Sequence, residues 1–296
     1  MLKVLLWIVS NDGRFFQNAI NTLGRQHNGV EIVGFTAIEE CKIDVDGKNV
    51  PVIPPNEIEW ENVDVLLVVG AKQIGMSKVT QAARLLNFHE EKLLGDWIAC
   101  IPGFTLEKYR QLQNSCLSIL AMNCFGGEIS NTLGLPFRSP IINMFFNEKD
   151  YLRFLRKPQA YMEEKLVFKG TKFETNLKFD YPVVMLGDVE INMNHYPYFD
   201  VAVEIWERRK ARINWKNLFV TMYTEREDIL QEFDALPYNK KACFVPFKSN
   251  LNSAWFIITK NVPLWMAVNR FGFGNPFFYD PFDMLLYGKK TPLIDM

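Results

Sequence analysis

The sequence has almost no excess of charge of either sign. Its 33 lysine and arginine side chains nearly balance 34 aspartates and glutamates, and the formal net charge is -1. A nearly neutral chain produces little long-range attraction for a polyanion or for an anionic bilayer. The composition therefore argues against nucleic acid as a partner.

Long hydrophobic runs are also missing. No stretch of the chain approaches the roughly 18 uninterrupted apolar residues of a membrane-spanning helix. The apolar run that ends at Val9 is broken by Asn11, Asp12 and Gly13 without a small-residue cleavage site, so we interpret it as a β-strand and not as a signal peptide. We therefore expect a soluble, cytoplasmic protein without a membrane span.

Cysteine and histidine are scarce, with five and three residues. The cysteines are scattered, odd in number and never in a CxxC pair, which argues against a disulfide framework and against a thiolate zinc site. Asp188 and Glu190 could hold a divalent ion, but no cluster of His, Asp and Glu at ligand spacing calls for a transition metal. We expect no metal site, and the sequence leaves the cofactor open.

What the chain does have is length and apolar content. Its 296 residues, 48% of them hydrophobic, favour two domains. Strands alternate with helices at the start of the chain, which predicts a parallel α/β sheet. The strands are expected at residues 3–9, 30–35 and 64–70, and a helix that begins after Thr105 closes this first domain at residue 114.

The second domain, residues 115–296, has a different residue pattern. Aromatic residues are dense, and Pro, Asn and Gly interrupt short apolar runs, as in an α/β domain of the α+β kind. The predicted helices cover residues 200–214 and 227–233, and the predicted strands 118–122, 218–222, 243–246 and 255–259. The tail from 265 to 287 is expected to be rich in loops, and its aromatic residues are a candidate docking surface.

The turn after the first strand lacks the residues of a dinucleotide site. Such a site needs glycines that let the backbone approach a pyrophosphate, and here Ser10, Asp12 and Phe15 take their places. The acidic residue expected after the second strand is also absent, since Ala37 stands there. We expect a degenerate module that docks or dimerises, and a homodimer is one alternative.

Over its first hundred residues the chain nevertheless resembles a known kind of module. The segments "EIVGF", "GKNVPVIPPNEI" and "DVLLVVGA" are similar to Rossmann-like βαβ modules that accompany sugar-nucleotide transferases in surface-glycan pathways. The resemblance implies the fold, a Rossmann-like parallel sheet, more than it implies a ligand.

A cysteine follows the first apolar strand of the second domain. Cys124 is expected at the start of a helix, where free backbone N–H groups favour a thiolate, as a nucleophile requires. Asn123 precedes it, and Gly126 and Gly127 let the backbone approach a substrate or an oxyanion. The alternative is a small buried apolar residue.

His195 is the histidine best placed to act as a general base in this domain, because His27 and His89 fall in polar stretches of the first. We predict that His195 meets Cys124 and that Asp188 takes part in catalysis. The residue that would orient the imidazole stays open. The candidates are Asp188, Asn192, Asn194 and Asn214.

An arginine-rich segment follows. Arg208 and Arg212 lie one helical turn apart in the predicted helix, and such a pair can hold a phosphate or a carboxylate. Asn214 is a further candidate for substrate binding. The alternative is a solvated helix face on which the arginines pair with Glu204 and Glu207.

Several motifs of the second domain together resemble one family. They read "NCFGGEISNTLGLPFRSPIINMFF", "YPVVMLGDVEINMNHY", "WERRKARINWKNLFV" and "EFDALPYNKKACF". Over residues 116–250 they resemble a bacterial family of unknown function associated with exopolysaccharide and capsule biosynthesis. The order of Cys, His and Arg-Arg is also similar to papain-like cysteine enzymes, and that resemblance implies Cys124 as nucleophile and His195 as base.

Three functions follow from these observations. The first is a transferase or acyl-transfer enzyme of exopolysaccharide or capsule biosynthesis that uses Cys124 and His195 on a small molecule or glycan precursor. The second is a phospho-group or sugar-nucleotide transferase without a cysteine nucleophile. The third is a non-catalytic scaffold of the glycan assembly machinery, which a cysteine remote from the histidine would favour.

Overall fold

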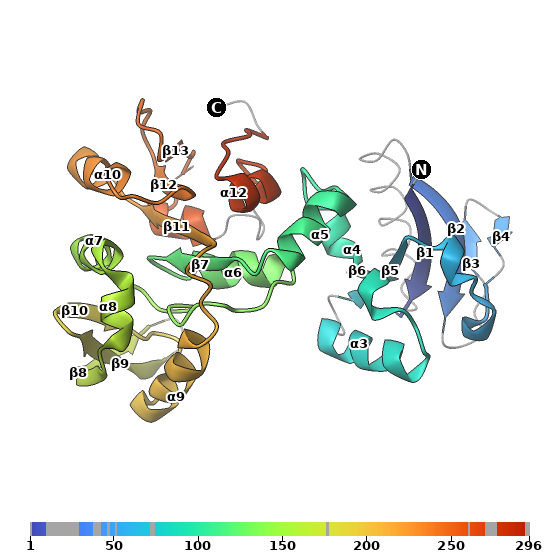
Figure 1. Cartoon of the computed structure of the whole chain (residues 1–296), viewed down its shortest axis with the longest axis horizontal. Coiled ribbons are helices and arrows are strands. Elements are labelled where there is room, and N and C mark those ends of the chain that lie inside the picture. The colour runs from blue at the N-terminus through green and yellow to red at the C-terminus, as the bar shows by residue number, and fades with distance from the viewer. Residues whose placement is uncertain are drawn as a thin grey trace. The chain divides into compact units, whose positions relative to one another are not determined.

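The computed structural model divides into two compact units, Met1–Phe104 and Thr105–Met296 (Figure 1). It describes residues 2–9, 30–37, 43–45, 48–50, 52–71, 75–175, 178–259, 261–269 and 277–293. None of the helices in these ranges has the length and apolar character that crossing a bilayer requires.

The first unit is built on a parallel sheet. Its described strands follow the order β2-β1-β5-β6, and every pairing is parallel. The strands are β1 (Leu2–Ile8), β2 (Val30–Ala37), β5 (Val65–Val69) and β6 (Leu93–Gly95). All five residues of β5 are buried, as expected of a strand covered on both faces. The Rossmann-like α/β prediction is confirmed.

Shorter elements complete this unit. The strands β3 (Ile43–Val45) and β4 (Lys48–Val50) pair in antiparallel register. The helices are α3 (Met76–Leu85) and α4 (Asp96–Ala99), with short 3₁₀ helices at Pro55–Glu57, Trp60–Asn62 and Glu90–Lys92. Ser10, Asp12 and Phe15, the positions that decide the dinucleotide site, lie outside the described residues.

The second unit contains a parallel sheet of its own. Its strands follow the order β13-β12-β11-β7, again with parallel pairings, and all four are labelled in Figure 1. They are β7 (Ser118–Ala121), β11 (Leu218–Tyr223), β12 (Lys241–Val245) and β13 (Ala254–Phe256). The helices α6 (Phe125–Thr132) and α10 (Glu227–Asp234) follow β7 and β11 along the chain.

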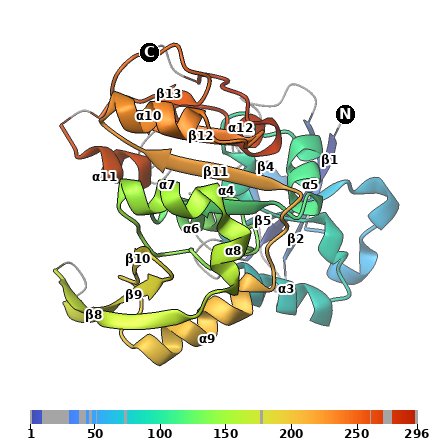
Figure 2. The ribbon, with the colours of Figure 1, turned by 60° about the vertical axis from the view of Figure 1, so that its left-hand side comes forward.

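A second, antiparallel sheet follows the order β10-β9-β8. Its strands are β8 (Leu166–Glu174), β9 (Phe179–Leu186) and β10 (Val189–Asn192). They come after α7 (Glu148–Arg156) and α8 (Pro158–Glu163) and before α9 (Phe199–Lys210), which lies beside β8 in Figure 2. Val184 and Val220, one from each sheet, belong to the same buried cluster, so the two sheets share one core.

The boundary between the units differs from the sequence prediction. We placed it at residue 114, whereas the structure places it after Phe104. The reason is that α5 (Leu106–Asn114) packs on α12 (Pro281–Tyr287) at the far end of the chain. Lys108 of α5 forms ion pairs of 2.9 and 2.7 Å with Asp280 and Asp283, and contacts that span so much sequence leave no local signal.

The predicted local structure also needs two corrections in the second unit. In the part of the tail that the structure describes, residues 265–269 and 277–287, the helices α11 (Leu264–Asn269) and α12 form where the sequence predicts many loops. The helix predicted over 200–214 ends at Lys210, so Arg212 and Asn214 lie in the turn that follows it.

Candidate active site

Cys124 lies at the carboxyl edge of the parallel sheet of the second unit. The strand β7 ends at Ala121, and Cys124 is the last residue before α6. Ligands of parallel α/β sheets bind at this edge, because the strands end there and the loops that follow them surround the same space. Cys124 is buried, with 9% of the residue exposed.

His195 lies in the turn after β10. The N–H of Tyr196 donates to the carbonyl of Met193 at 2.9 Å and closes the turn. The Tyr196 hydroxyl donates to the carbonyl of Ile142 at 3.2 Å and accepts a hydrogen bond from Arg209 at 2.8 Å. These contacts fix the turn from both sides, and His195 as a whole residue is exposed.

One short segment joins the two halves of the site. The N–H of Phe146 donates to the carbonyl of Met122 at 2.9 Å, next to the end of β7. The neighbouring Phe145 exchanges two backbone hydrogen bonds of 2.9 Å with Asn192, the last residue of β10. The ends of β7 and β10 are thereby tied together. Their side chains meet, with 3.4 Å between Cys124 Sγ and His195 Nε2.

The surroundings keep this Cys124–His195 pair neutral at rest. Burial raises the pKa of Cys124 to about 12, and the carboxylates of Glu128 and Glu174 add to the rise, while the backbone N–H of Cys124 opposes it. Desolvation lowers the pKa of His195, and Glu174 acts against this shift. A thiol facing an uncharged imidazole can pass its proton to the ring only as the sulfur reacts.

Glu128 and Glu174 were not among the residues singled out from the sequence. Glu128 lies one helical turn after Cys124 on α6, and burial raises the pKa of its carboxyl. Glu174 ends β8 and pairs with Phe179, the first residue of β9. The chain after β10 continues past this same end of the sheet, since the N–H of Met193 donates to the carbonyl of Pro182 at 3.0 Å.

Asp188 lies at the opposite end of that sheet, in the turn between β9 and β10. A hydrogen bond of 2.5 Å from the Tyr161 hydroxyl and the guanidinium of Arg153 at 3.5 Å lower the pKa of Asp188. The four residues of β10 separate this turn from the His195 turn by roughly 13 Å at about 3.3 Å per residue. The structure therefore brings His195 to Cys124 and leaves Asp188 apart from them.

The three predicted substrate-binding residues next to Cys124 are Asn123, Gly126 and Gly127, and all three are buried. The side-chain oxygen of Asn123 accepts a hydrogen bond of 3.2 Å from the N–H of Phe125, while its buried amide nitrogen has no partner among the described residues. A Cβ on Gly127 would lie 2.4 Å from Asn143 Oδ1, so the missing side chain lets α6 pack closely on a neighbouring loop.

Of the other orienters that we considered, Asn192 and Asn194 lie near His195, in or just after β10. Asn192 Oδ1 accepts a hydrogen bond of 3.0 Å from Lys172. The buried Asn194 Oδ1 has no partner among the described residues. Neither side chain has a described hydrogen bond to the imidazole.

The arginine that supports the site is Arg209, which the sequence analysis passed over. It binds Tyr196 and lies over the Phe137 ring at 5.2 Å. Arg208 and Arg212 are both exposed, and the end of α9 before Arg212 removes the helical pairing expected of them. Asn214 lies at the amino edge of the sheet, where its N–H donates to Ser118 Oγ at 2.8 Å.

The carboxylates that we considered as metal ligands form ion pairs with lysine and arginine side chains instead. Glu190 contacts Lys169 and Lys172 at 2.6 and 3.0 Å, and Asp188 faces Arg153. Within the described ranges, no group of three or more His, Cys, Asp or Glu side chains could hold a metal ion.

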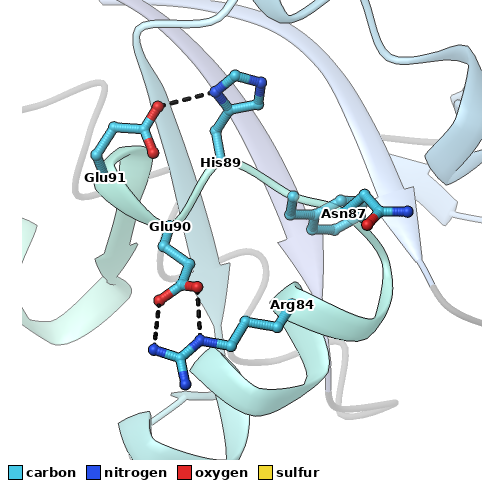
Figure 3. Close-up of a pocket in the computed structure, with 6 residues that line it drawn as sticks. Arg84, Asn87, His89, Glu90 and Glu91 are labelled. Carbon is cyan, nitrogen blue, oxygen red and sulfur yellow. Dashed lines mark hydrogen bonds and ion pairs between the residues drawn. The ribbon is translucent and has the colours of Figure 1, made fainter.

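The first unit has a hollow of about 400 Å³ near the end of α3 (Figure 3). Its charged side chains pair with one another. Arg84 contacts both carboxylate oxygens of Glu90, at 2.6 and 3.0 Å, and His89 Nδ1 lies 2.8 Å from Glu91. The His89 ring also lies 4.9 Å from that of Trp60. These contacts give His89 a role in holding the surface together.

Comparisons with known proteins extend the description. Residues 100–287, more than half of the chain, match the family described as "Domain of unknown function (DUF1919)". An uncharacterized protein of Haemophilus influenzae is 32% identical over 182 residues, which are 59% of this chain and 84% of that protein.

Among solved structures, aspartate semialdehyde dehydrogenase II from Vibrio cholerae, complexed with ASA, matches 56% of this chain at 12% identity. The chain spans about half of that protein, 49%, with a TM-score of 0.24. A similarity at this level carries no argument about fold or activity.

Proposed function

The chain belongs to the DUF1919 family, and we propose that it is an acyl-transfer enzyme with Cys124 as nucleophile and His195 as general base. The observation that carries this proposal is the 3.4 Å between Cys124 Sγ and His195 Nε2, two side chains from distant parts of the chain. A nucleophile and its base must come within hydrogen-bond reach, and this distance is looser in the absence of substrate.

The proposed reaction begins from the neutral pair. As the sulfur of Cys124 attacks the carbonyl carbon of an acyl donor, the thiol proton moves to His195 Nε2. The tetrahedral intermediate collapses to a thioester, and His195 returns the proton to the leaving group. An acceptor hydroxyl then gives its proton to His195 and attacks the thioester, which transfers the acyl group and restores the thiol.

Asn123 is the proposed donor to the developing oxyanion. Its side-chain nitrogen is buried beside the nucleophile without an acceptor among the described residues, and a buried donor of this kind has a free energy cost until it is paired. A negative oxygen formed at the carbonyl would provide the partner. Loss of one oxyanion donor costs about 10²–10³ in kcat, so we expect Asn123→Ala to be slow.

For the acceptor we propose a hydroxyl of a glycan precursor in exopolysaccharide or capsule biosynthesis. This part of the proposal rests on the resemblance of residues 116–250 to the family associated with those pathways. The alternative of a phospho-group transferase is less well supported, because Arg208 and Arg212 do not form the expected pair. The scaffold alternative offers no reason for Cys124 and His195 to meet.

The test is formation of an acyl-enzyme with p-nitrophenyl acetate. We expect acetylation of Cys124 in the intact protein, found by mass spectrometry of its peptides. Cys124→Ser should abolish it, and His195→Ala should slow it by about 10²–10⁴. Cys116→Ser is the matched control, because Cys116 is exposed and its loss should leave the labelling of Cys124 unchanged. The absence of label on Cys124, or labelling of Cys124 at an unchanged rate in His195→Ala, would refute the proposal.

A further inference from the structure

The second unit holds a hollow of about 390 Å³ away from the Cys124–His195 pair. It is lined by Gln159, Met162, Glu163, Lys210 and Trp215. The first three residues come from α8, Lys210 ends α9, and Trp215 follows it before β11. Small-molecule sites have volumes of roughly 300–1,000 Å³, so this hollow has room for a small ligand.

The hollow is separate from the proposed active site. Trp215 comes three residues before Leu218, which begins β11, and the adjacent Asn214 binds Ser118 at the start of β7. Both strands begin at this edge of the sheet. Cys124 follows the opposite, carboxyl end of β7, so a ligand in the hollow would not touch it.

Unlike the hollow in the first unit, this one is lined by polar side chains that do not pair with one another. Gln159 and Glu163 lie four residues apart on α8 and therefore share one face of the helix. Neither side chain has a hydrogen-bond partner among the described residues. Lys210 Nζ lies 2.7 Å from Glu207, and an ammonium group has further N–H bonds to donate.

The lining offers an apolar surface and mixed hydrogen-bonding groups. The half-buried indole of Trp215 packs against the core, and Met162 is buried. Around them stand an amide that donates and accepts, a carboxylate that accepts and an ammonium that donates. Lys210 and Glu207 balance each other in charge, so Glu163 is left as the carboxylate that can accept hydrogen bonds from a ligand.

We propose that this hollow binds a sugar ring. Sugar hydroxyls both donate and accept, as the mixed lining requires, and the C–H face of a pyranose is an apolar surface that fits against an indole. The site goes beyond the proposed catalytic function and does not depend on Cys124. It would hold a carbohydrate chain or a glycosylated molecule at a second point on the protein.

The experiment is an NMR titration of the ¹⁵N-labelled full chain with the methyl β-glycosides of glucose, galactose and N-acetylglucosamine. We expect a saturable shift of the Trp215 indole N–H, assigned with Trp215→Phe. Glu163→Gln and Gln159→Ala should weaken binding by about tenfold, since a truncated hydrogen bond to a charged or buried group costs about 1.5 kcal/mol. Glu164→Gln and Trp265→Ala are the matched controls, and both should bind normally.

Several outcomes would overturn the proposal. One is the absence of a saturable shift with all three glycosides. Another is a shift with tetramethylammonium or inorganic phosphate alone, which would make the hollow an ion site. A third is glycoside binding that Glu163→Gln and Gln159→Ala leave unchanged. Because these two residues are exposed on α8, their variants are expected to fold.

Discussion

The ionisation of Cys124 is the property of the site that can be tested most directly. A pKa of about 12, caused mainly by burial, means that the resting enzyme carries a thiol and not a thiolate. The perturbation is pH, and the assay is the rate at which iodoacetamide alkylates Cys124. A short unstructured peptide with one cysteine, whose thiol has the ordinary pKa of about 8.5, serves as the reference, and Cys124→Ser measures the contribution of the other cysteines.

The expected rate follows from two opposing factors. At pH 7.5 a thiol of pKa about 12 is roughly 3 × 10⁻⁵ ionised, against about 0.1 for an ordinary cysteine of pKa about 8.5, a ratio of about 3,000. A more basic thiolate is also more nucleophilic, and with a Brønsted slope of about 0.45 this recovers about 40-fold. Cys124 should therefore react about 80-fold more slowly than the reference, before any steric effect.

The pH profile distinguishes this state from a preformed ion pair. We expect the rate to rise about tenfold per pH unit from 6 to 10 without a plateau, because the thiolate fraction does so. Glu174→Gln and Glu128→Gln should each accelerate alkylation by removing a carboxylate that disfavours the thiolate. A fast rate that is independent of pH between 5 and 8 would refute the reasoning, because it would require a stable thiolate–imidazolium pair.

Other predictions concern stability, measured by urea unfolding. Burial raises the pKa of the Glu128 carboxyl in the folded protein, so its ionisation destabilises the fold at pH values above the ordinary pKa of about 4.3. Glu128→Gln should therefore have a higher free energy of unfolding than the parent protein at pH 7, and the same free energy below pH 4. Gly127→Ala should cost about 1–3 kcal/mol, because the new Cβ meets Asn143 Oδ1 at 2.4 Å. Lys108→Ala should cost about 3 kcal/mol by leaving its two buried acidic partners without a cation, and a loss under 1 kcal/mol would contradict their coupling.

The parallel sheets could be predicted because their strands carry a strong local signal. The run Val65–Val69 is apolar at every position, and only a strand covered on both faces accounts for such a pattern in so few residues. The N-terminal cap of α5 was equally local, since Thr105 accepts a hydrogen bond from the N–H of Lys108 at 3.1 Å. The helix on which α5 packs, α12, is far away in the sequence. The sequence therefore places the boundary between the units after α5, whereas the structure places it before α5.

Arg209 shows a signal that was present but not used. It lies three residues after Trp206 and seven after Ala202, the two buried residues of α9, and therefore on the buried face of that helix. Arginine on such a face must find partners inside the protein, and Arg209 finds the Tyr196 hydroxyl beside His195. The choice of Arg208 and Arg212 assumed a longer helix and a ligand in solvent.

The acidic group that acts on both Cys124 and His195 was beyond the reach of sequence, because its position depends on strand pairing. Asp188 and His195 are close in the chain, yet an extended strand lies between them and places them at opposite ends of the hairpin sheet. Glu174 is far more distant in sequence, but β8 runs antiparallel to β9 and ends where the chain after β10 arrives. The acidic group whose charge acts on both Cys124 and His195 is therefore the one at the end of β8, and only the register of the sheet identifies it.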